Sequence, residues 1–583
     1  MKRLLFIIVI LTLTGMLFTS CREDPVDPAK QELRDGEWTG YGEGRNGAIV
    51  AKVLISGHQV ERVTIVNQSE SVFAQDAINT IVAKAVGRQE AMNVEVDGVT
   101  GATLTSTGVI DAINMALAAA MGKEQEKKTY KDGSCDIVVV GAGGAGLSAA
   151  IAAAEADGTL QIIVLEKQGI VGGNTNYSTG GINAAETEVQ QALRIEDSKD
   201  IFYDDIMKGG KQENIPSLVR NFVEHAPATI SWLIGLGADL SDVGLMGGSS
   251  VRRTHRPRGG AAIGPHLMKI LKLAIDDNQI EIRTSNKVTG LLTSGNQVTG
   301  VQVQNADGSS YQLRAKAVII ATGGFGANLQ MVSTLQPSLA GFATLNHPGA
   351  TGDAVGWVTN IGGATIQMAN IQIHPTAEAT NHILITEAVR GNGAILVNHG
   401  GQRFCNEMAT RDVVSAAIIS QQGSKAYLIF DHAVRQSLAS IETYANQHLL
   451  LEGTTIEDLA GRLNIPAETL TATVQHYNGW QTAGLDEDFG RSATEMPVAL
   501  STPPYYAVHV APAIHHTMGG LSVNTDTQVL RADGTPIPGL YAAGEVTGGL
   551  HGANRLGGNG VADIVVNGRL AGIAASRYIS DFK

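Results

Sequence analysis

The 583-residue sequence is poor in cysteine, in aromatic side chains and in charge. Its three cysteines are too few for a disulfide framework or an iron–sulfur cluster, and no Cys-x-x-Cys-His motif for attached haem occurs. Any role in electron transfer must therefore use an organic cofactor. Lys and Arg number 42 against 56 Asp and Glu, a net charge of −14. This balance argues against a nucleic-acid partner, which requires a basic face.

Long hydrophobic runs are also missing. The longest candidate, residues 4–11, is shorter than the roughly 18 residues that a membrane-spanning helix needs. Basic residues precede it, and small residues lead to Cys21, an order typical of an export signal. Residues 1–21 resemble a bacterial lipoprotein signal with Cys21 as the lipidated residue; the alternative is an ordinary signal peptide cleaved nearby. We therefore expect an exported protein on the cell-envelope side of a bacterial membrane, facing the periplasm or the cell surface and held only by a lipid anchor and a tether over 22–35.

Glycine is what the chain has in excess. Its 69 glycines are roughly 12% of the residues against a usual level of about 7%. They lack the three-residue period of collagen, so they indicate tight turns and close backbone approaches. The length suggests about two to four domains.

A small module is predicted over residues 36–121. Its patterns predict strands over 48–55 and 60–66 and helices over 76–86 and 106–120. A turn of Gly and Thr precedes the second helix, so a phosphate could bind at the helix N-terminus beside Thr103. The simpler interpretation is a turn that only caps the helix.

The same segment carries a flavin-attachment motif. The motif Asp-x-x-Ser/Thr-Gly-Ala-Thr is matched by Asp97, Thr100, Gly101, Ala102 and Thr103. The module thereby resembles the FMN-binding domain of flavin-linked reductases and of subunits of sodium-pumping quinone reductases. The resemblance implies a small α+β domain with FMN joined covalently to Thr103 through a phosphoester, attached by a separate flavin transferase.

A dinucleotide-binding pattern follows a charged linker over 122–133. A predicted strand at 135–140 leads into a glycine-rich turn at 141–146 and a helix at 147–155. A second strand at 161–165 follows and ends at the acidic Glu166. The glycines permit the turn at Gly141, close approach of a pyrophosphate at Gly143 and close helix–strand packing at Gly146. Glu166 would hold ribose hydroxyls. The alternative is a strand-to-helix turn that binds nothing.

From about residue 135 to the C-terminus, the sequence resembles the flavoprotein subunit of fumarate reductase and succinate dehydrogenase, most closely the soluble flavocytochrome c and urocanate reductase type. The resemblance implies an α/β fold: a Rossmann-like FAD-binding domain, at 134–370 and 505–583, interrupted by an α+β capping domain at 371–504. The membrane complexes attach FAD to a histidine in the segment matching 173–180; no histidine occurs there, so we expect non-covalent FAD. The expected cofactor residues, besides Thr103, are Gly141, Gly143, Gly144, Ala145, Gly146, Glu166, Lys167, Gly173, Asn174, Thr175, Gly180, Gly181, Ala321, Thr322, Gly323, Gly324, His516, Gly544, Glu545, Arg555, Gly558 and Asn559.

Reduction of a double bond conjugated to carboxylates needs a hydride, a proton donor on the opposite face and cations that bind the acid. Arginine suits bidentate carboxylate binding, and His and Thr add directed hydrogen bonds. The resemblance implies that His515 and Arg555 bind one carboxylate, while His374, Thr386 and Glu387 hold the other.

The resemblance also implies that Arg411 is the proton donor and is recharged through Glu387 and Arg390. Arginine is a poor acid, with a pKa above about 12. Transfer is therefore plausible only to a carbanion-like centre within hydrogen-bond reach.

The retained His374, Thr386 and Glu387 favour fumarate, giving succinate, over urocanate, acrylate or an aryl acrylate. Electrons would pass from an external donor, membrane quinol-linked or soluble, to FMN and then to FAD; no metal site is expected. A rival of another class is a lipid-anchored electron-transfer flavoprotein without catalysis.

Overall fold

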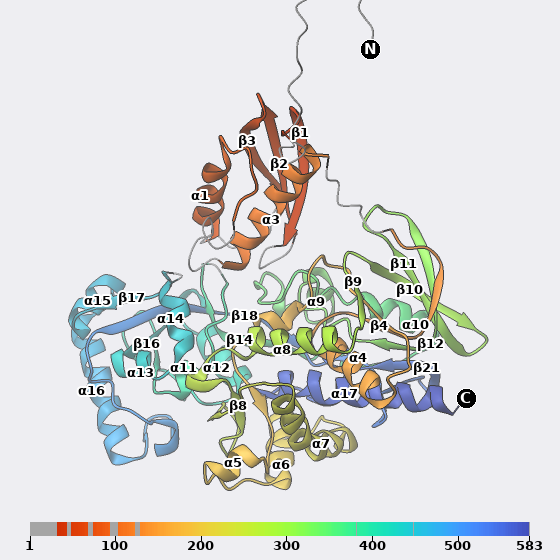
Figure 1. Cartoon of the computed structure of the whole chain (residues 1–583). Coiled ribbons are helices and arrows are strands. Elements are labelled where there is room, and N and C mark those ends of the chain that lie inside the picture. Colours follow the sequence, from red (N-terminus) through yellow and green to blue (C-terminus); the bar gives the residue numbers. More distant parts are fainter. Residues whose placement is uncertain are drawn as a thin grey trace, which may run out of the picture.

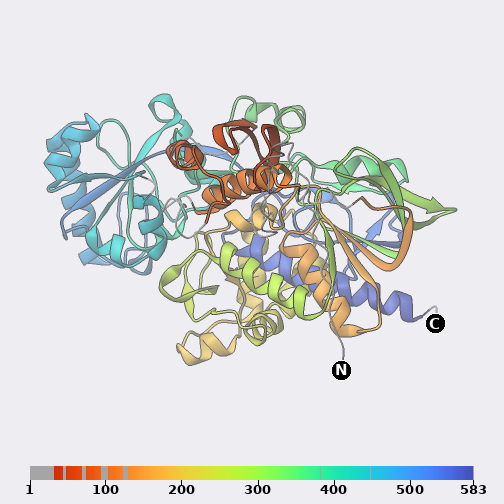
Figure 2. The same ribbon diagram turned by 45° about the horizontal axis from the view of Figure 1, so that its top comes forward.

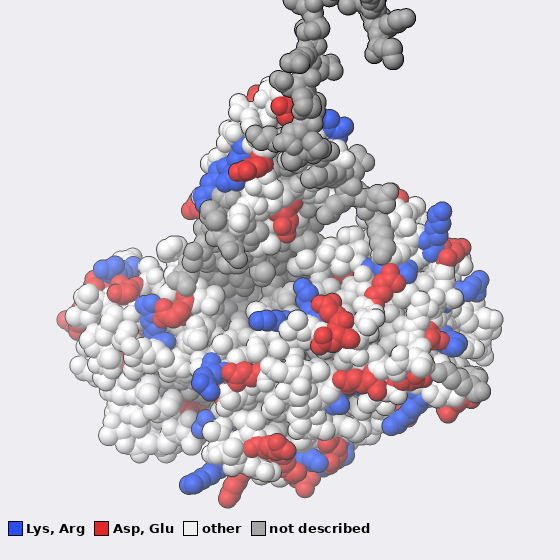
Figure 3. All heavy atoms as spheres, in the orientation of Figure 1, with Lys and Arg blue, Asp and Glu red and all other residues white. Residues whose placement is uncertain are grey.

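The computed structural model describes residues 32–43, 48–67, 74–93, 103–122, 129–380, 382–446 and 448–581. The predicted signal with Cys21, part of the tether and residues 97–102 of the flavin-attachment motif lie outside this set. In the part of the chain that is described, no helix has the length and hydrophobicity to cross a membrane. On the face shown in Figure 3, acidic and basic side chains are interspersed over the surface.

In its described residues, the N-terminal module has a three-stranded antiparallel sheet with the helices α1 and α3 (Figure 1). Its elements are β1 (Gly36–Glu43), β2 (Ala48–Ser56), β3 (Gln59–Asn67), α1 (Gln75–Ala85) and α3 (Thr103–Ala120). The helix α3 packs directly on β1 because Gly40 and Gly42 have no side chain. A Cβ atom at either glycine would lie 1.9 Å from a carbonyl oxygen of α3. This module is the predicted α+β domain.

The large module is built on an eight-stranded sheet with the order β10-β11-β12-β4-β5-β9, in which β21 pairs with β12 and β20 pairs with β21. The strands are β4 (Gly133–Val140), β5 (Ile162–Leu165), β9 (Glu281–Arg283), β10 (Lys287–Ser294), β11 (Gln297–Gln304), β12 (Ser310–Ile320), β20 (Gln528–Leu530) and β21 (Pro536–Ala542). The strands β21, β12, β4, β5 and β9 run parallel. In open parallel sheets, ligands bind at the carboxyl ends of the strands.

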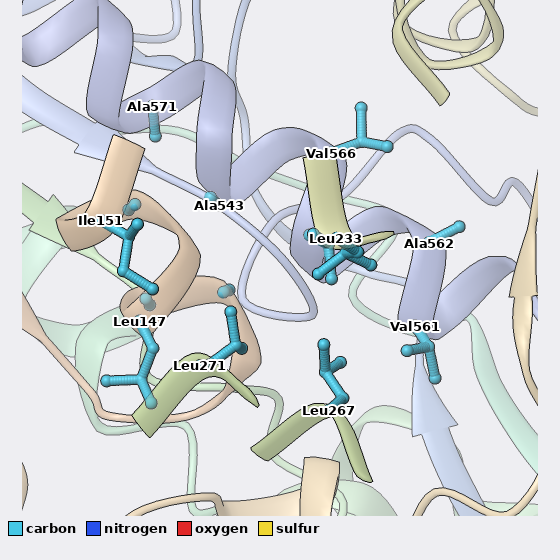
Figure 4. Packing of buried hydrophobic residues seen from close by; sticks show 14 of the residues in the cluster. Leu147, Ile151, Leu233, Leu267, Leu271, Ala543, Val561, Ala562, Val566 and Ala571 are labelled. Carbon is cyan, nitrogen blue, oxygen red and sulfur yellow. The ribbon is translucent and has the colours of Figure 1, made fainter. Parts of the chain in front are cut away.

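Helices α4 (Gly144–Ala156), α7 (Pro216–Gly235), α8 (Ile263–Asp277) and α17 (Asn559–Ser580) supply much of the core of this module. Figure 4 shows their buried side chains, among them Leu147 and Ile151 of α4, Leu271 of α8 and Val566 of α17. Glycine allows α17 to lie against α4: a Cβ atom at Gly572 would stand 2.1 Å from a carbonyl oxygen of α4. The packing fixes both helix N-termini next to the sheet.

Smaller elements complete the module: β6 (Ile182–Asn183), α5 (Glu188–Ala192), α6 (Lys199–Gly209), β7 (Asp242–Gly244), β8 (Thr254–Arg256), α9 (Leu329–Leu335), α10 (Asp353–Asn360), β13 (Thr365–Ile366) and β19 (Gly520–Leu521). The strands β6, β8 and β7 form a short sheet, and β13 pairs with β19. The loop from β7 to β8 reaches the second part of the large module, described next.

That second part, the cap, is an antiparallel five-stranded sheet with surrounding helices (Figures 1 and 2). Its strands are β14 (Ile371–Glu378), β15 (Ile395–Val397), β16 (Ala426–Asp431), β17 (Leu451–Gly453) and β18 (Tyr505–Thr517). Its helices are α11 (Ala388–Gly391), α12 (Arg411–Ile419), α13 (His432–Gln436), α14 (Ala439–Asn446), α15 (Ile456–Leu463) and α16 (Ala467–Ala483).

The structure confirms the predicted fold class, an FAD-domain architecture of α/β type interrupted by an α+β cap. The predicted strands match β2, β3, β4 and β5 to within two residues at each end. The helices predicted from 106 and 147 each begin three residues earlier, at Thr103 and Gly144. The cap sheet also continues past the predicted limit at residue 504. Its strand β18 pairs with β14, β16 and β17, so the chain leaves the cap within a strand rather than in a loop.

Candidate active site

A cavity lies where the carboxyl ends of β4, β5 and β12 meet the cap. Its lining extends from the glycine-rich turn after β4 to histidines and arginines of the cap, so a dinucleotide and a substrate could share it. The predicted residues that line it are Gly141, Gly143, Gly144, Ala145, Glu166, Lys167, Gly173, Asn174, Thr175, Gly180, Gly181, Ala321, Thr322, Gly323, His374, Thr386, Glu387, Arg411, His515, His516, Glu545, Arg555 and Gly558.

Five predicted residues do not line the cavity. Gly146, Gly324 and Gly544 allow close packing instead: a Cβ atom at these positions would lie 1.8, 2.1 and 2.9 Å from neighbouring atoms. Asn559 begins α17 and accepts a hydrogen bond from Asn183 at 2.7 Å. Arg390 lies behind Glu387, with 1% of its surface exposed.

The glycine-rich turn after β4 has the geometry of a pyrophosphate cradle. Gly141 has φ 107°, and a Cβ there would lie 2.3 Å from the Ala321 carbonyl oxygen. Gly143 is the N-cap of α4, and the N–H of Gly144 donates to the Thr175 hydroxyl at 3.0 Å. The open N-terminus of a 13-residue helix at the cavity wall suits a phosphate.

Glu166 ends β5 at the cavity wall. Its carboxylate accepts hydrogen bonds from the N–H groups of Ala142 at 2.9 Å and Gln168 at 2.8 Å, one on each oxygen. Burial raises the pKa of Glu166. Lys167 is paired with Asp353 at 2.9 Å. Each carboxylate oxygen of Glu166 has a second lone pair that a ribose hydroxyl could use.

Polar groups for a flavin ring system surround Asn174. Its amide donates to Asn346 at 2.7 Å and to the Glu545 carboxylate at 3.3 Å. Two further polar atoms of the cavity-lining residues, Thr322 Oγ1 and His347 Nε2, are buried without a hydrogen-bond partner. Orphaned polar atoms beside a glycine-lined cavity are the arrangement expected where a polar cofactor completes the site. These residues therefore fit FAD.

Arg411 begins α12 and donates from Nε to the Glu387 carboxylate at 2.8 Å. The other Glu387 oxygen accepts from the N–H of Gly247 in the β7–β8 loop. Burial raises the pKa of Glu387, but the charges of Arg411 and Arg390 outweigh burial and leave that pKa below its usual value. The carboxylate is therefore ionised and balances the cation beside it.

A second layer of charge lies behind this pair. Nη2 of Arg390 stands 3.7 Å from Glu387, and burial lowers the pKa of Arg390. Arg390 also donates to the carbonyl of Glu407, whose carboxylate is paired with Arg403 at 2.8 Å and Arg491 at 3.1 Å. Glu387 therefore joins the cavity to a buried row of cations.

Two neutral histidines lie on the cap side of the cavity. The rings of His374 and His515 have centroids 5.0 Å apart. Burial, with the charge of Arg411, holds the pKa of each histidine well below its ordinary value. Nδ1 of His374 accepts from the N–H of Thr376 at 3.2 Å. Its proton is therefore on Nε2, which is a donor.

Arg555 is 5% exposed and, in the described part of the chain, forms no ion pair with a carboxylate. Burial lowers its pKa to about 9. Nη1 donates to the Leu556 carbonyl at 3.1 Å, and Nε has no partner. A buried guanidinium without a counter-ion is energetically unfavourable, so the arrangement indicates that an anionic ligand binds beside Arg555.

His516 follows His515 on β18, where the register against β14 shifts. Its ring packs edge-on against His551 at 5.4 Å, and His551 lies 3.3 Å from Asp563. Nδ1 of His516 is buried without a partner, while the side chain lines the cavity. Adjacent residues of one strand therefore serve two parts of the same cavity.

Sequence reasoning missed Gln372 and Gly247. Gln372 accepts from Arg411 at 3.1 Å and donates to Asn554 at 2.7 Å and to the Arg555 carbonyl at 2.8 Å. It stands two positions before His374 in β14, so the period of a strand could have placed both side chains on one face. No local signal marks Gly247, because its role depends on a contact with the cap.

Known proteins resemble both modules. Residues 136–561 match the FAD binding domain family and residues 44–118 match the FMN-binding domain family. The chain is 43% identical over 489 residues to an NADH:fumarate oxidoreductase of Klebsiella pneumoniae (83% of the chain, 52% of that protein) and thus spans about half that relative's length. It is 46% identical to a fumarate reductase (cytochrome) of Shewanella frigidimarina (76% and 77%) and 35% identical to a urocanate reductase of Eggerthella lenta (92% and 92%). The solved open conformation of a flavocytochrome c3 fumarate reductase matches with TM-score 0.65 and 41% identity, over 77% of this chain and 79% of that one.

Proposed function

The chain belongs to the FAD binding domain family of flavin oxidoreductases and carries an FMN-binding domain in front of it; on that premise we propose that it reduces fumarate to succinate. The observation that carries the proposal is the arrangement of donors at two places in the cavity. Arg411 is paired with Glu387, whereas Arg555 forms no ion pair with a carboxylate in the described part of the chain and can take one carboxylate of the substrate. His374 and Thr386 also line the cavity and can donate hydrogen bonds to a second carboxylate.

The two carboxylates of the substrate would be held at opposite ends of the site. Arg555 and His515 bind one carboxylate, and Arg555 gains the counter-ion that it lacks. Nε2 of His374, the hydroxyl of Thr386 and the region of Glu387 hold the other. Because His374 and His515 are neutral, they donate hydrogen bonds without adding charge.

FAD, when bound, supplies the hydride for the double bond. Arg411 gives a proton from its guanidinium to the neighbouring carbon, which becomes carbanion-like as the hydride arrives. Glu387 is ionised at rest, so its carboxylate first takes up a proton from the side of Arg390 and then passes it to Arg411, whose Nε lies 2.8 Å away, which restores the guanidinium. Closure of the cap over the cavity excludes water from these steps.

The N-terminal module would deliver the electrons. Thr103 begins the 18-residue helix α3, and a phosphoester of FMN on its hydroxyl would lie at a helix N-terminus, which favours a phosphate. A flavin transferase would attach the FMN, and a quinol-linked or soluble donor would reduce it. We further propose export and a lipid anchor on Cys21, which the order of residues 1–21 supports.

The second candidate is a reductase of another unsaturated acid. The similarity to the urocanate reductase of Eggerthella lenta favours this candidate. The alignment covers 92% of this chain and 92% of that protein, so it extends into the N-terminal module. Urocanate and acrylate carry one carboxylate each and would leave one of the two proposed carboxylate sites empty.

An anaerobic assay with reduced viologen and a panel of fumarate, urocanate, acrylate and an aryl acrylate tests the proposal. We expect fumarate to give the highest kcat/KM by at least about tenfold. Turnover of another acid without fumarate turnover would select the second candidate. Arg411→Lys should lower kcat by about 10²-fold or more, whereas Arg462→Lys on the exposed face of α15 should change nothing. Unchanged activity in Arg411→Lys would refute Arg411 as proton donor.

A further inference from the structure

Glu387 belongs to the cap, but its carboxylate lies against two glycines of the FAD-binding part. Gly247 is in the loop between β7 and β8, and Gly557 is in the loop before α17. A Cβ atom at Gly247 would stand 2.9 Å from Oε1 of Glu387, and one at Gly557 would stand 3.2 Å from both carboxylate oxygens. We define these two glycines as the glutamate seat.

Real Cβ atoms essentially never lie within 3.0 Å of another heavy atom, so any side chain at Gly247 would displace the carboxylate or the backbone beside it. The same Cβ would also stand 3.0 and 3.1 Å from the carbonyl oxygens of Met408 and Ala409. Those carbonyls belong to the cap segment that leads into Arg411. Gly247 therefore packs against Glu387 and against the segment that leads into Arg411.

The contact is also polar. The N–H of Gly247 donates to one oxygen of Glu387, and Nε of Arg411 donates to the other at 2.8 Å. Each oxygen of the carboxylate thus has a fixed donor, one from the FAD-binding part and one from the cap. The orientation of the carboxylate toward Arg411 is set across the boundary between the two parts.

Backbone conformation does not explain these glycines. Gly247 and Gly557 are absent from the positions with positive φ, whereas the neighbouring Gly248 and Gly558 have φ of 81° and 82°. A positive φ is therefore not the reason for glycine at positions 247 and 557. The reason is space: Glu387 is close at both positions, the Met408 and Ala409 carbonyls are close to Gly247, and the Met246 side chain is close to Gly557, at 3.0 Å from a Cβ there.

We propose that Gly247 and Gly557 are positioning residues that orient Glu387 for proton return to Arg411 only when the cap is closed on the FAD-binding part. The inference rests on the proposed proton path and adds a condition to it. With the cap closed, the N–H of Gly247 and the space above Gly557 hold the carboxylate in line with Arg411. With the cap displaced, Glu387 would lose the Gly247 donor, and proton return would stop until closure.

The test uses Gly247→Ala and Gly557→Ala in the full chain, with Gly356→Ala as matched control. Gly356 is in α10, and a Cβ there would meet nothing within 4 Å. With the best acid of the panel as substrate, we expect kcat to fall about tenfold or more in the two seat variants. The solvent deuterium isotope effect on kcat should rise, because proton return becomes slower. FAD content and KM should stay within about twofold to threefold, and the control should match the wild type.

A second measurement does not depend on turnover. If the added methyl group collides with Glu387, Gly247→Ala should lower Tm by about 3 °C or more with Glu387 present and by less than half of that in Glu387→Ala, which opens the space. Equal shifts in both backgrounds, or a kcat within twofold of the wild type in both seat variants, would overturn the inference. Failure of every acid in the panel would refute the proposed function, while the Tm cycle would still decide whether the seat exists.

Discussion

The side-chain oxygen of Gln372 accepts a hydrogen bond from Nη1 of Arg411 at 3.1 Å. The amide nitrogen of the same side chain donates to the carbonyl of Arg555 at 2.8 Å. One buried amide, 4% exposed, therefore links the residue proposed to give the proton to the residue proposed to bind the substrate. A neutral group, which adds no charge of its own, therefore joins the guanidinium of Arg411 to the backbone of Arg555.

Gln372→Met keeps the volume of this side chain and removes its hydrogen bonds. We expect kcat/KM for the unsaturated acid to fall about tenfold or more, because Arg411 loses its second anchor and the Arg555 carbonyl loses a donor. FAD content after purification should not change. Steady-state kinetics and flavin absorbance measure both, and an unchanged kcat/KM would show that Gln372 does not set the spacing.

Stability should fall in mild acid. Burial lowers the pKa of His347 to about 4 and holds those of His374, His515 and His516 well below 6.5. Below pH 6.5 the unfolded chain therefore binds more protons than the folded chain. The stability that these neutral histidines contribute is present above pH 6.5 and is lost as the pH falls through that value.

Each such histidine removes up to about 1.4 kcal/mol of unfolding free energy per pH unit below 6.5. Thermal unfolding at pH 7.5, 6.5 and 5.5 measures the effect, with Tm expected to change little in the first step and to drop in the second. His225→Gln, at an exposed position of α7, is the control: its Tm should change with pH in the same way as that of the wild type. A Tm that is constant from pH 7.5 to 5.5 would contradict the neutral state of these side chains.

Covalent flavin attachment can be tested at the start of α3. Thr103→Ala removes the hydroxyl that would form the phosphoester. The band of the protein on a denaturing gel should therefore lose its flavin fluorescence. Thr107→Ala, one turn further along the same helix, should keep it. Persistent fluorescence in Thr103→Ala would place the attachment elsewhere. Viologen-driven reduction should survive in both variants if viologen reduces FAD directly.

The contact of α17 with α4 predicts a stability difference between two helical glycines. Gly572→Ala would place a methyl group 2.1 Å from the Ala149 carbonyl, so we expect a loss of about 1–3 kcal/mol. Gly479→Ala on α16 meets nothing within 4 Å and should gain about 0.5–1 kcal/mol from helix propensity. Denaturant unfolding measures both, and equal effects would contradict the close packing of the two helices.

The elements with a local signal could be predicted from the sequence. The order of glycines from Gly141 to Gly146 between two apolar runs fixed β4, α4 and β5, since tight turns require glycine whatever the surroundings. Candidate site residues stood out as histidines and arginines in segments that resemble a known family. All but Arg390 of the proposed catalytic and substrate residues line the cavity.

What could not be predicted depends on distant contacts. The pairing of Arg411 with Glu387 is indicated only by the family resemblance and by no local pattern. The role of Gln372 follows only from its contacts with both Arg411 and Arg555. The neutral state of His374 follows from burial, which no single residue type reveals. The predicted cap, residues 371–504, ends before β18, because its limits follow from the site residues it must carry and not from strand pairing.

The position of β18 has a consequence for the construction of chimeras. Its thirteen residues pair with three strands of the cap, yet they also bring His515 and His516 to the cavity. A cap transplanted between relatives with junctions at 371 and 504 would arrive without its central strand and would have to pair with a foreign one. Exchange of residues 371–517 as one block keeps the sheet intact, and it transfers the donor's two histidines with it. The two cavity-lining histidines and an intact cap sheet are therefore exchanged together.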